Sequence, residues 1–279
     1  MTAAPGANWN VSAGESIVDR ASFSAPKRSL GQNFLADPNI CRRIVASVGL
    51  AHGDPVLEIG PGRGALTRFL AEHQGPVMVL EKDRALVRWL KGEFPSVGVV
   101  HADGLTFCWE GTEGLPGLSL VGNLPYNVAS PMIWEMVSRC RLWKGMTFMV
   151  QKEVAERLTA KEGSRAYGAL SAWVGSFALA SYMFTVPPHV FRPRPKVDSA
   201  IVRFIPRTDP AFEAAGALSR TLKILFQQRR KQLGSILKGR WSESVERWCV
   251  AEGVDRRVRP EALAPDTLRA LALALESGK

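Results

Sequence analysis

The fold is decided by the stretch Asp54-Pro55-Val56-Leu57-Glu58-Ile59-Gly60-Pro61-Gly62-Arg63-Gly64-Ala65-Leu66-Thr67. Its first half, to Ile59, predicts a short strand, and the apolar spacing of Leu66, Phe69 and Leu70 predicts a helix after the glycines. Glycines let a backbone approach a ligand closely, and a helix N-terminus offers free N–H groups. Strand, glycine-rich turn and helix together predict the nucleotide-binding opening of a doubly wound α/β sheet.

An acidic residue follows the second expected strand. Val77 to Leu80 is apolar and runs into Glu81, about 20 positions after Gly60. A carboxylate at this spacing can bind the hydroxyls of a ribose. Gly60, Gly62 and Ala65 also satisfy the looser dinucleotide pattern, so these features alone leave NAD binding open.

Two more expected strands end in polar residues. Val97 to Val100 precedes Asp103, which is either an acceptor for an adenine amine or part of an ordinary Asp-Gly turn. The run from Leu118 to Val121 leads into Asn123-Leu124-Pro125-Tyr126, which is either a tight turn or a stiff cradle for a flat, amine-bearing ring. Because the carboxyl ends of parallel strands meet at one edge, these residues are expected at one site.

The rest of the chain predicts a division into three parts. Further strands are expected at Met146–Val150 and Ala200–Phe204. Asp37-Pro38 predicts the start of a helix, and the apolar spacing of Thr221–Lys238 predicts one amphipathic helix with a basic face. We therefore expect a flexible tail over residues 1–26, an α/β domain over 27–206 and a small helical domain over 207–279.

Bulk composition favours a polyanionic partner. The 279 residues carry a formal net charge of +10, and 46% of them are hydrophobic, as in ordinary globular proteins. The four cysteines form no C-x-x-C pair, which speaks against zinc or a disulfide framework and favours the cytoplasm. No apolar run is long enough for a membrane span and no secretory signal is evident, so we expect a cytoplasmic monomer without a metal.

The ordered set of motifs resembles the KsgA-like ribosomal RNA adenine dimethyltransferases, which use S-adenosylmethionine (SAM). The resemblance covers about Lys27 to Leu237 and rests on Gly31-Gln32-Asn33-Phe34-Leu35, Glu58-Ile59-Gly60-Pro61-Gly62, Glu81, Asp103, Asn123-Leu124-Pro125-Tyr126, Gln151-Lys152-Glu153-Val154, Pro193-Arg194-Pro195-Lys196-Val197-Asp198-Ser199-Ala200 and Gln228-Arg229-Arg230-Lys231. It implies a Rossmann-like, seven-stranded class I methyltransferase fold with a small C-terminal helical domain. It also implies dimethylation of the N6 amines of two adjacent adenines near the 3′ end of small-subunit (16S) rRNA, during ribosome assembly.

The resemblance assigns roles to individual residues. Around the cofactor it places Asn33, Leu35, Gly60, Glu81, Asp103 and Asn123, with Glu81 on the ribose and Asp103 on the adenine amine. Asn123 and a carbonyl of Leu124 or Pro125 would accept the hydrogens of the target N6, and Tyr126 and Phe191 would stack on the target base. Phe191 could instead be a loop anchor, and Glu58 could either order the glycine turn or simply end its strand. No histidine is assigned a role.

The basic residues expected to contact rRNA of the small subunit lie in three segments, namely Lys27 and Arg28, then Arg192, Arg194 and Lys196, and then Arg229, Arg230, Lys231 and Lys238. Four alternative hypotheses remain for the function. They are a large-subunit rRNA adenine methyltransferase of the antibiotic-resistance type (the first rival), a DNA or protein amide methyltransferase, a non-catalytic RNA-binding assembly factor and a NAD dehydrogenase. The Pro195–Ala200 segment argues against the first rival, and the intact cofactor motifs argue against a factor without catalysis.

Overall fold

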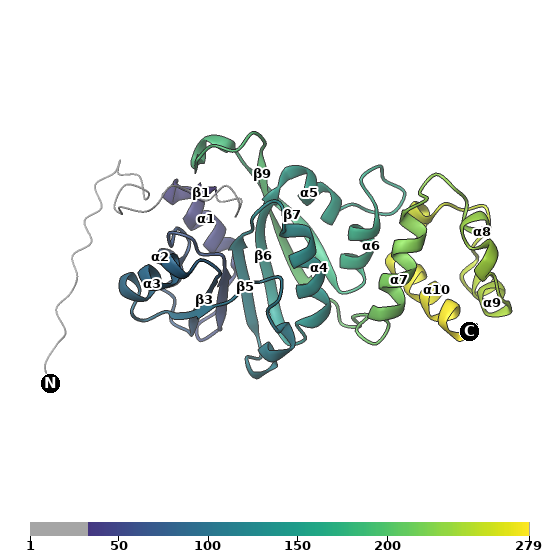
Figure 1. Cartoon of the computed structure of the whole chain (residues 1–279), viewed down its shortest axis with the longest axis horizontal. Coiled ribbons are helices and arrows are strands. Elements are labelled where there is room, and N and C mark those ends of the chain that lie inside the picture. The colour runs from purple at the N-terminus through teal and green to yellow at the C-terminus, as the bar shows by residue number, and fades with distance from the viewer. Residues whose placement is uncertain (1–32, 279) are drawn as a thin grey trace, which may run out of the picture.

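A twisted seven-stranded sheet forms the centre of the molecule (Figure 1), and the computed structural model describes residues 33–278. The strand order is β4-β3-β2-β5-β6-β9-β7. The strands are β2 (Val56–Ile59), β3 (Val77–Glu81), β4 (Gly98–His101), β5 (Leu118–Asn123), β6 (Trp143–Gln151), β7 (Ala178–Val186) and β9 (Ser199–Pro206). The expected strands are all present; β6 and β9 are longer than expected, whereas β2 begins two residues later and β4 is shifted by one residue.

In the central sheet the strands β2 to β6 are parallel, whereas β7 and β9 are antiparallel to their neighbours. β2 pairs in parallel with β3 on one side and with β5 on the other. β3 pairs in parallel with β4, and β5 pairs in parallel with β6. β9 runs antiparallel to β6, and β7 runs antiparallel to β9 at the sheet edge. The carboxyl ends of the parallel strands therefore share one edge, as the sequence predicted.

Helices cover both faces of the sheet, which gives three layers. One face is covered by α1 (Pro38–Val48), α2 (Thr67–Leu70) and α3 (Arg84–Glu93), and the other by the short helix η2 (Trp109–Gly114) with α4 (Ala129–Arg139), α5 (Lys152–Leu158) and α6 (Ala169–Gly175). α1 starts where the sequence predicts, because the Asp37 side chain accepts hydrogen bonds from the N–H groups of Asn39 and Ile40.

A small antiparallel ribbon joins the start of the described chain to the proline-rich loop. Its strands are β1 (Phe34–Leu35) and β8 (Phe191–Arg192), and the short helix η3 (Pro188–Val190) precedes β8. Phe34 is paired with Arg192, and Leu35 is paired with Phe191. The ribbon therefore links two of the sequence motifs that are far apart along the chain.

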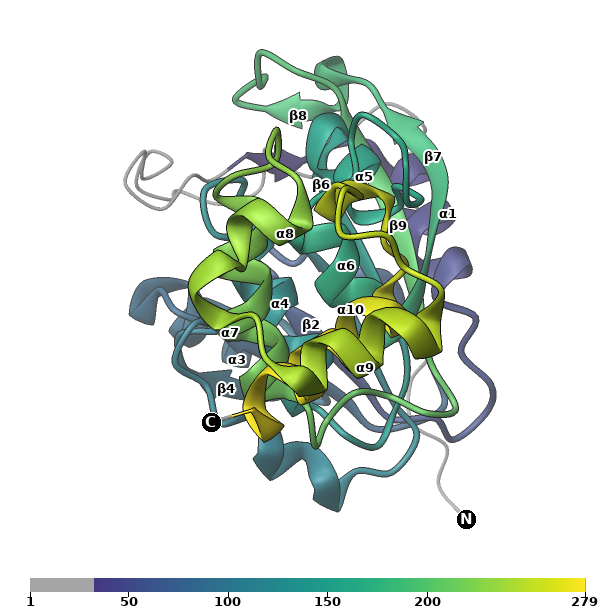
Figure 2. The ribbon, with the colours of Figure 1, turned by 90° about the vertical axis from the view of Figure 1, so that its right-hand side faces the viewer.

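The C-terminal helices gather at one end of the molecule, in front of the sheet in Figure 2. They are α7 (Ala215–Phe226), α8 (Leu233–Ile236), η4 (Lys238–Arg240), α9 (Glu243–Glu252), η5 (Pro260–Ala262) and α10 (Pro265–Ser277). Their buried residues, such as Leu222 and Leu268, belong to the same apolar cluster as Trp173 and Phe177. The hydroxyl of Tyr167 also donates to the carbonyl of Leu263. The division at residue 206 stays a prediction.

The expectation of one continuous helix over Thr221–Lys238 is wrong. α7 ends at Phe226, residues 227–230 form turns, residue 231 is a bend, and α8 begins at Leu233. The N–H groups of Leu233 and Gly234 donate to the carbonyls of Val258 and Arg256 instead of to a preceding helical turn. These long-range hydrogen bonds satisfy the start of α8 and make the break possible without a proline.

The described residues contain neither a membrane-spanning helix nor a cluster of metal-binding side chains. Within 33–278, no helix is long and apolar enough to cross a membrane. In the same part of the chain, no group of three or more His, Cys, Asp or Glu side chains is placed to hold a metal ion.

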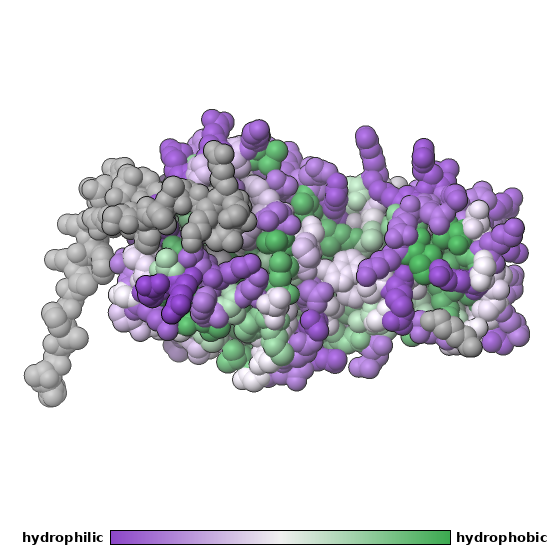
Figure 3. Space-filling view, in the orientation of Figure 1, coloured by the Kyte–Doolittle hydropathy of each residue, from purple (hydrophilic) through white to green (hydrophobic). Residues whose placement is uncertain are grey.

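Figure 3 shows that hydrophilic side chains cover much of one face and surround an apolar patch at the end formed by the C-terminal helices.

Candidate active site

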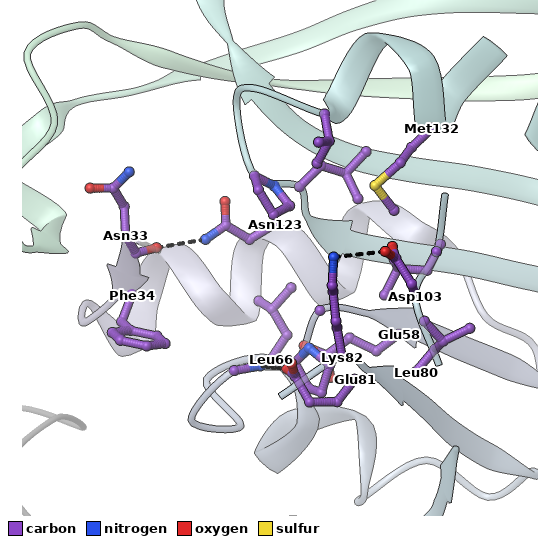
Figure 4. Close-up of a pocket in the computed structure, with 18 of the residues that line it drawn as sticks. Asn33, Phe34, Glu58, Leu66, Leu80, Glu81, Lys82, Asp103, Asn123 and Met132 are labelled. Carbon is purple, nitrogen blue, oxygen red and sulfur yellow. Dashed lines mark hydrogen bonds and ion pairs between the residues drawn. The ribbon is translucent and has the colours of Figure 1, made fainter. Parts of the chain in front are cut away.

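A pocket opens at the carboxyl edge of the parallel strands (Figure 4). It is lined by residues from β1, the glycine turn and the segments that follow β3, β4 and β5. The lining includes Asn33, Phe34, Leu35, Glu58, Gly60, Gly62, Arg63, Glu81, Lys82, Asp103, Leu105, Asn123, Leu124, Pro125, Tyr126 and Met132. All six residues that the sequence predicts for cofactor binding are among them. No histidine lines this pocket.

The glycine turn is held close beneath the ring of Phe34. Gly62 has a positive φ of 56°, and a Cβ on it would lie 2.9 Å from the Phe34 ring. The guanidinium of Arg63 lies over the same ring, 4.7 Å from its centroid. Only glycine at position 62 leaves room for this arrangement, which places β1 against the turn. Phe34 and Arg63 stand within the sequence motifs, but no local pattern predicts their contact with each other.

Glu81 ends β3 with its carboxylate directed at the glycine turn. One carboxylate oxygen accepts a hydrogen bond from the backbone N–H of Asp83, at 2.8 Å, and the other from that of Gly62, at 3.2 Å. Burial raises the pKa of Glu81 above its ordinary value, although these N–H groups act against the rise. The carboxylate is therefore fixed in orientation at the place where a ribose diol is expected.

Glu58 is a second buried carboxyl group beside the glycine turn. It is 1% exposed and lines the pocket, and its carboxylate accepts a hydrogen bond of 2.5 Å from the Thr67 hydroxyl. Burial raises the pKa of Glu58 to about 8, against the opposing effect of that hydrogen bond. Because Thr67 is the first residue of α2, Glu58 ties β2 to this helix across the turn. The structure therefore supports the first of the two roles considered for Glu58.

Asp103 follows β4 and forms an ion pair with Lys82, which follows β3. The Lys82 ammonium lies 2.7 Å from one carboxylate oxygen of Asp103, and the other oxygen accepts from the N–H of Leu105 at 3.0 Å. The hydrogen bond from Lys82 is the main cause that lowers the pKa of Asp103. Asp103 is thus an ionised, oriented acceptor in the pocket. Lys82 was not predicted from the sequence, where its only signal is its position directly after Glu81.

Asn123 ends β5, and its amide is oriented by the segment before β1. Its Nδ2 donates to the backbone carbonyl of Asn33 at 2.9 Å (Figure 4). Since a carbonyl oxygen can only accept, the amide nitrogen must face Asn33. The Oδ1 atom is consequently turned away from Asn33 and is available as an acceptor in the pocket.

The two backbone carbonyls that follow Asn123 differ in their partners. The Pro125 carbonyl accepts hydrogen bonds from the N–H groups of Val128 and Ala129 at the start of α4. The Leu124 N–H donates to the carbonyl of Met149 in β6, whereas the Leu124 carbonyl has no donor among the described residues. Leu124 therefore offers the free acceptor beside Asn123.

Tyr126 is anchored through its hydroxyl. This group shares a hydrogen bond of 2.6 Å with the hydroxyl of Ser199, which is fully buried at the start of β9. Burial raises the pKa of Tyr126, so the phenol stays neutral and holds its position. The bond gives a physical role to Ser199, which the sequence motif included without an assignment.

At Phe191 the structure differs from the expected stacking position. The ring is fully buried in the apolar cluster with Ile44, Met149 and Ile201, and it does not line the pocket. Pairing of β8 with β1 aligns Phe191 with Leu35 and places its side chain in this core. In this conformation Phe191 is the loop anchor that the sequence also allowed, and stacking on a base would require the ring to leave the core.

The basic residues expected to contact RNA fall into two described groups, while Lys27 and Arg28 lie outside the described residues. Arg192, Arg194 and Lys196 are exposed around β8, and Arg229, Arg230, Lys231 and Lys238 are exposed around the α7–α8 turn. Both segments lie along the upper edge of the molecule in Figures 1 and 2, the edge at which β6 runs into α5. The Arg229 guanidinium donates to the carbonyls of Arg165 and Tyr167, so this residue also holds a neighbouring loop.

The residues that line the pocket fit SAM in three ways. Glu81 offers a fixed carboxylate for a diol, Asp103 offers one for an amine, and the close packing at Gly62 leaves a backbone surface that a larger residue would block. These groups lie at the carboxyl edge of a parallel sheet, where such folds bind nucleotides.

Comparisons with known proteins agree with this geometry. The family described as ribosomal RNA adenine dimethylase matches residues 24–274. A ribosomal RNA small subunit methyltransferase A from Maridesulfovibrio salexigens is 47% identical over 243 residues, covering 86% of this chain and 91% of the relative. The protein of the same name from Nitratidesulfovibrio vulgaris (strain Hildenborough) is 46% identical over 256 residues, covering 89% and 96%.

Solved structures of two RNA-modifying enzymes share the fold. A dimethyladenosine transferase from Plasmodium falciparum aligns with a TM-score of 0.71 at 25% identity, covering 88% of this chain and 98% of that chain. The 23S rRNA methyltransferase ErmE aligns with a TM-score of 0.67 at 27% identity, covering 88% and 100%. The fold is thus that of a class I SAM-dependent methyltransferase, its cofactor is SAM, and the chain belongs to the ribosomal RNA adenine dimethylase family.

Proposed function

We propose that this protein transfers methyl groups from SAM to the N6 amines of two adjacent adenines near the 3′ end of small-subunit rRNA, leaving each as N6,N6-dimethyladenosine. The observation that carries the proposal is the orientation of Asn123, whose Oδ1 is turned away from Asn33 and precedes a Leu124 carbonyl that has no donor among the described residues. The names of the curated relatives support the small subunit as the source of the rRNA.

The difficulty of the reaction lies with the acceptor nitrogen. The lone pair of adenine N6 is delocalised into the ring, and the base is stacked in its RNA until it is extracted. Two acceptors placed side by side can each accept a hydrogen bond from one N6–H and favour a pyramidal nitrogen, whose lone pair is then localised and directed at the methyl group. Positioning of this kind can contribute roughly 7 to 11 kcal/mol in favourable cases.

Asn123 and Leu124 are the two acceptors that we assign to the amine. Pro125 is the less suitable partner, because the start of α4 already donates two hydrogen bonds to its carbonyl. Bound SAM supplies an activated methyl group on a sulfonium, so the transfer requires no covalent intermediate with the protein. The chain's own task is to hold the amine in line and to exclude water.

Tyr126 supports the plane of the target base. Its hydroxyl bond to Ser199 fixes the ring at the pocket. Stacking of a base on an aromatic ring contributes about 1 to 3 kcal/mol. Phe191 can supply a second ring only after it leaves the core. We therefore assign Tyr126 as the primary stacking residue and Phe191 as one that acts after the β8 loop rearranges.

The RNA contacts follow from the two exposed basic segments. The first segment, with Arg192, Arg194 and Lys196, begins in β8 and follows it. The second, with Arg230, Lys231 and Lys238, comprises the α7–α8 turn and the start of η4, and both segments lie along the same edge. Cations of this kind contact phosphates, which position a substrate without reading its sequence. We propose that a monomer in the cytoplasm binds the assembling small ribosomal subunit along this edge, with the helical domain as a second point of attachment.

Transfer of tritiated methyl groups from SAM to purified ribosomal particles tests the proposal. Small subunits that lack the modification should incorporate label, whereas fully modified small subunits and large subunits should not. Because ErmE acts on 23S rRNA by its name and shares the fold, the large subunit is the necessary comparison. Label that enters large subunits alone would refute the proposed substrate while leaving the family assignment intact.

A further inference from the structure

The ion pair between Lys82 and Asp103 crosses the cofactor pocket. Lys82 is the first residue after β3, and Asp103 is the second residue after β4, the neighbouring parallel strand. The pairing of Glu81 with His101 places these two strand ends side by side. The distance of 2.7 Å between the ammonium and the carboxylate joins them directly, as the dashed line in Figure 4 shows.

The Lys82 side chain extends from the Glu81 end of the pocket to the Asp103 end (Figure 4). Glu81 and Asp103 are the carboxylates that suit a ribose and an adenine amine. Because these two parts of a nucleoside are covalently joined, a nucleoside that contacts both carboxylates must lie along the lysine stem. Lysine stems pack on apolar and aromatic surfaces while their charged heads keep polar partners.

The carboxylate of Asp103 retains capacity for one more donor. Leu105 N–H uses one oxygen and the Lys82 ammonium uses the other. An ionised carboxylate has about four acceptor positions, so an adenine N6–H can still be bound. The two existing donors fix the plane of the carboxylate, and a fixed acceptor loses less entropy when the ligand binds.

We propose that Lys82 is a positioning residue for the cofactor, which holds Asp103 as an oriented carboxylate for the adenine amine and packs its stem along the adenine ring. The proposal rests on the proposed function in one respect, the assignment of Asp103 to that amine. It makes Lys82 a determinant of the preference for an adenine over a purine that carries oxygen at position 6.

The test compares the affinities of S-adenosylhomocysteine and S-inosylhomocysteine, which differ at position 6 of the purine. Calorimetry is performed with the wild type and with Lys82→Met, which keeps most of the stem and removes the charge. Lys82→Arg keeps the charge, and Lys91→Met is the matched control because Lys91 is an exposed lysine on α3 that does not line the pocket. Thermal unfolding of each variant verifies that it is folded.

Lys82→Met should lose about tenfold of the preference for the adenosyl ligand, since a charge-assisted hydrogen bond network is removed. Lys82→Arg and Lys91→Met should keep the preference. On acidification, the preference in Lys82→Met should disappear at a higher pH than in the wild type, because the carboxylate is then no longer held ionised. A generic loss of packing would not move this pH dependence.

An unchanged preference in Lys82→Met would overturn the inference, whether both affinities stay as in the wild type or both fall by the same factor. Asp103→Asn separates this failure from a failure of the proposed cofactor contacts. If Asp103→Asn loses the preference and Lys82→Met does not, only the role of Lys82 is refuted, whereas an intact preference in Asp103→Asn refutes the assignment of Asp103 itself.

Discussion

The side-chain amide of Asn123 is fixed by the backbone carbonyl of Asn33, with 2.9 Å between Nδ2 and the carbonyl oxygen. The contact connects the end of β5 with the segment that leads into β1, and β1 in turn pairs with β8. The acceptor oxygen at the proposed transfer point is therefore oriented by the same ribbon that carries Arg192 and Phe191. The cofactor pocket and the β8 loop are therefore joined through the hydrogen bond from Asn123 to Asn33 and through the β1–β8 ribbon.

Removal of the Asn123 side-chain amide should impair the positioning of the target adenine amine while the cofactor site stays intact. We expect Asn123→Ala to lower kcat by about 100-fold or more, because misplacement of the reacting nitrogen by about 1 Å has an effect of that size. Binding of S-adenosylhomocysteine, measured by calorimetry, should change little in the same variant. Near-wild-type turnover by Asn123→Ala would remove Asn123 from the proposed role.

The Tyr126 ring and the Tyr126 hydroxyl should have separable effects. Tyr126→Ala should lower kcat/KM by about 5- to 150-fold, the equivalent of one lost base stack of about 1 to 3 kcal/mol. Tyr126→Phe keeps the ring and loses only the bond to Ser199, so its decrease should be much smaller, and Ser199→Ala should resemble it. If Tyr126→Phe is as impaired as Tyr126→Ala, the hydroxyl rather than the stack is what matters.

Glu58 should make the stability of the protein depend on pH. Its pKa is about 8 in the folded state, against an ordinary value near 4.5. Between these values the folded state binds one proton more than the unfolded state, so the free energy of unfolding falls as pH rises, by up to about 1.4 kcal/mol per pH unit. The contribution is complete below pH 4.5 and is lost as pH passes 8.

Denaturant unfolding of the wild type and Glu58→Gln over pH 5 to 8 measures this contribution. Glutamine can still accept from Thr67 and does not ionise, so the variant should lose less stability than the wild type as pH rises. Burial also raises the pKa of Glu81, and because the charge of Glu81 contributes to the raised pKa of Glu58, the difference between the two profiles includes the coupling of the two groups. Parallel pH profiles for the two proteins would show that Glu58 does not bind the additional proton.

The cations of the α7–α8 turn should divide into RNA contacts and a structural contact. The double variant Arg230→Glu with Lys231→Glu should weaken binding to small subunits and reduce the slope of log affinity against log salt by roughly one for each lost phosphate contact. Its thermal unfolding should be unchanged, because both residues are exposed. Filter binding at several salt concentrations provides the measurement.

Arg229 is the matched comparison within the same turn. Since its guanidinium donates to the carbonyls of Arg165 and Tyr167, Arg229→Ala should lower the unfolding temperature as well. Equal unfolding temperatures for all three proteins would contradict the structural role of Arg229. Binding by the double variant that is as tight and as salt-dependent as in the wild type would remove the turn from the interface.

Local signals in the sequence were sufficient for the α/β half of the fold. The glycine turn after Ile59, the apolar runs and the Asp37 cap all act within a few residues, so strands and the start of α1 could be predicted. The break at residues 227–231 could not be predicted, because it depends on carbonyls of Arg256 and Val258 that come much later in the chain. No glycine or proline marks that turn.

The candidate site divides in the same way. Residues at strand ends, such as Glu81, Asp103 and Asn123, could be predicted because parallel strands bring their carboxyl ends together. The burial of Phe191 depends on pairing with Leu35, and Ser199 meets Tyr126 only through the order of the sheet strands. Contacts of this kind between distant segments leave no local pattern, so only the folded structure reveals them.

Mass-spectrometric mapping of small-subunit rRNA after incubation with the protein and SAM tests the central claim most directly. Unmodified small subunits should gain four methyl groups as two adjacent N6,N6-dimethyladenosines near the 3′ end, and Asn123→Ala should add them about 100-fold more slowly or slower still. Methylation of a single adenine, transfer to another position, or full modification by Asn123→Ala at the wild-type rate would contradict the account.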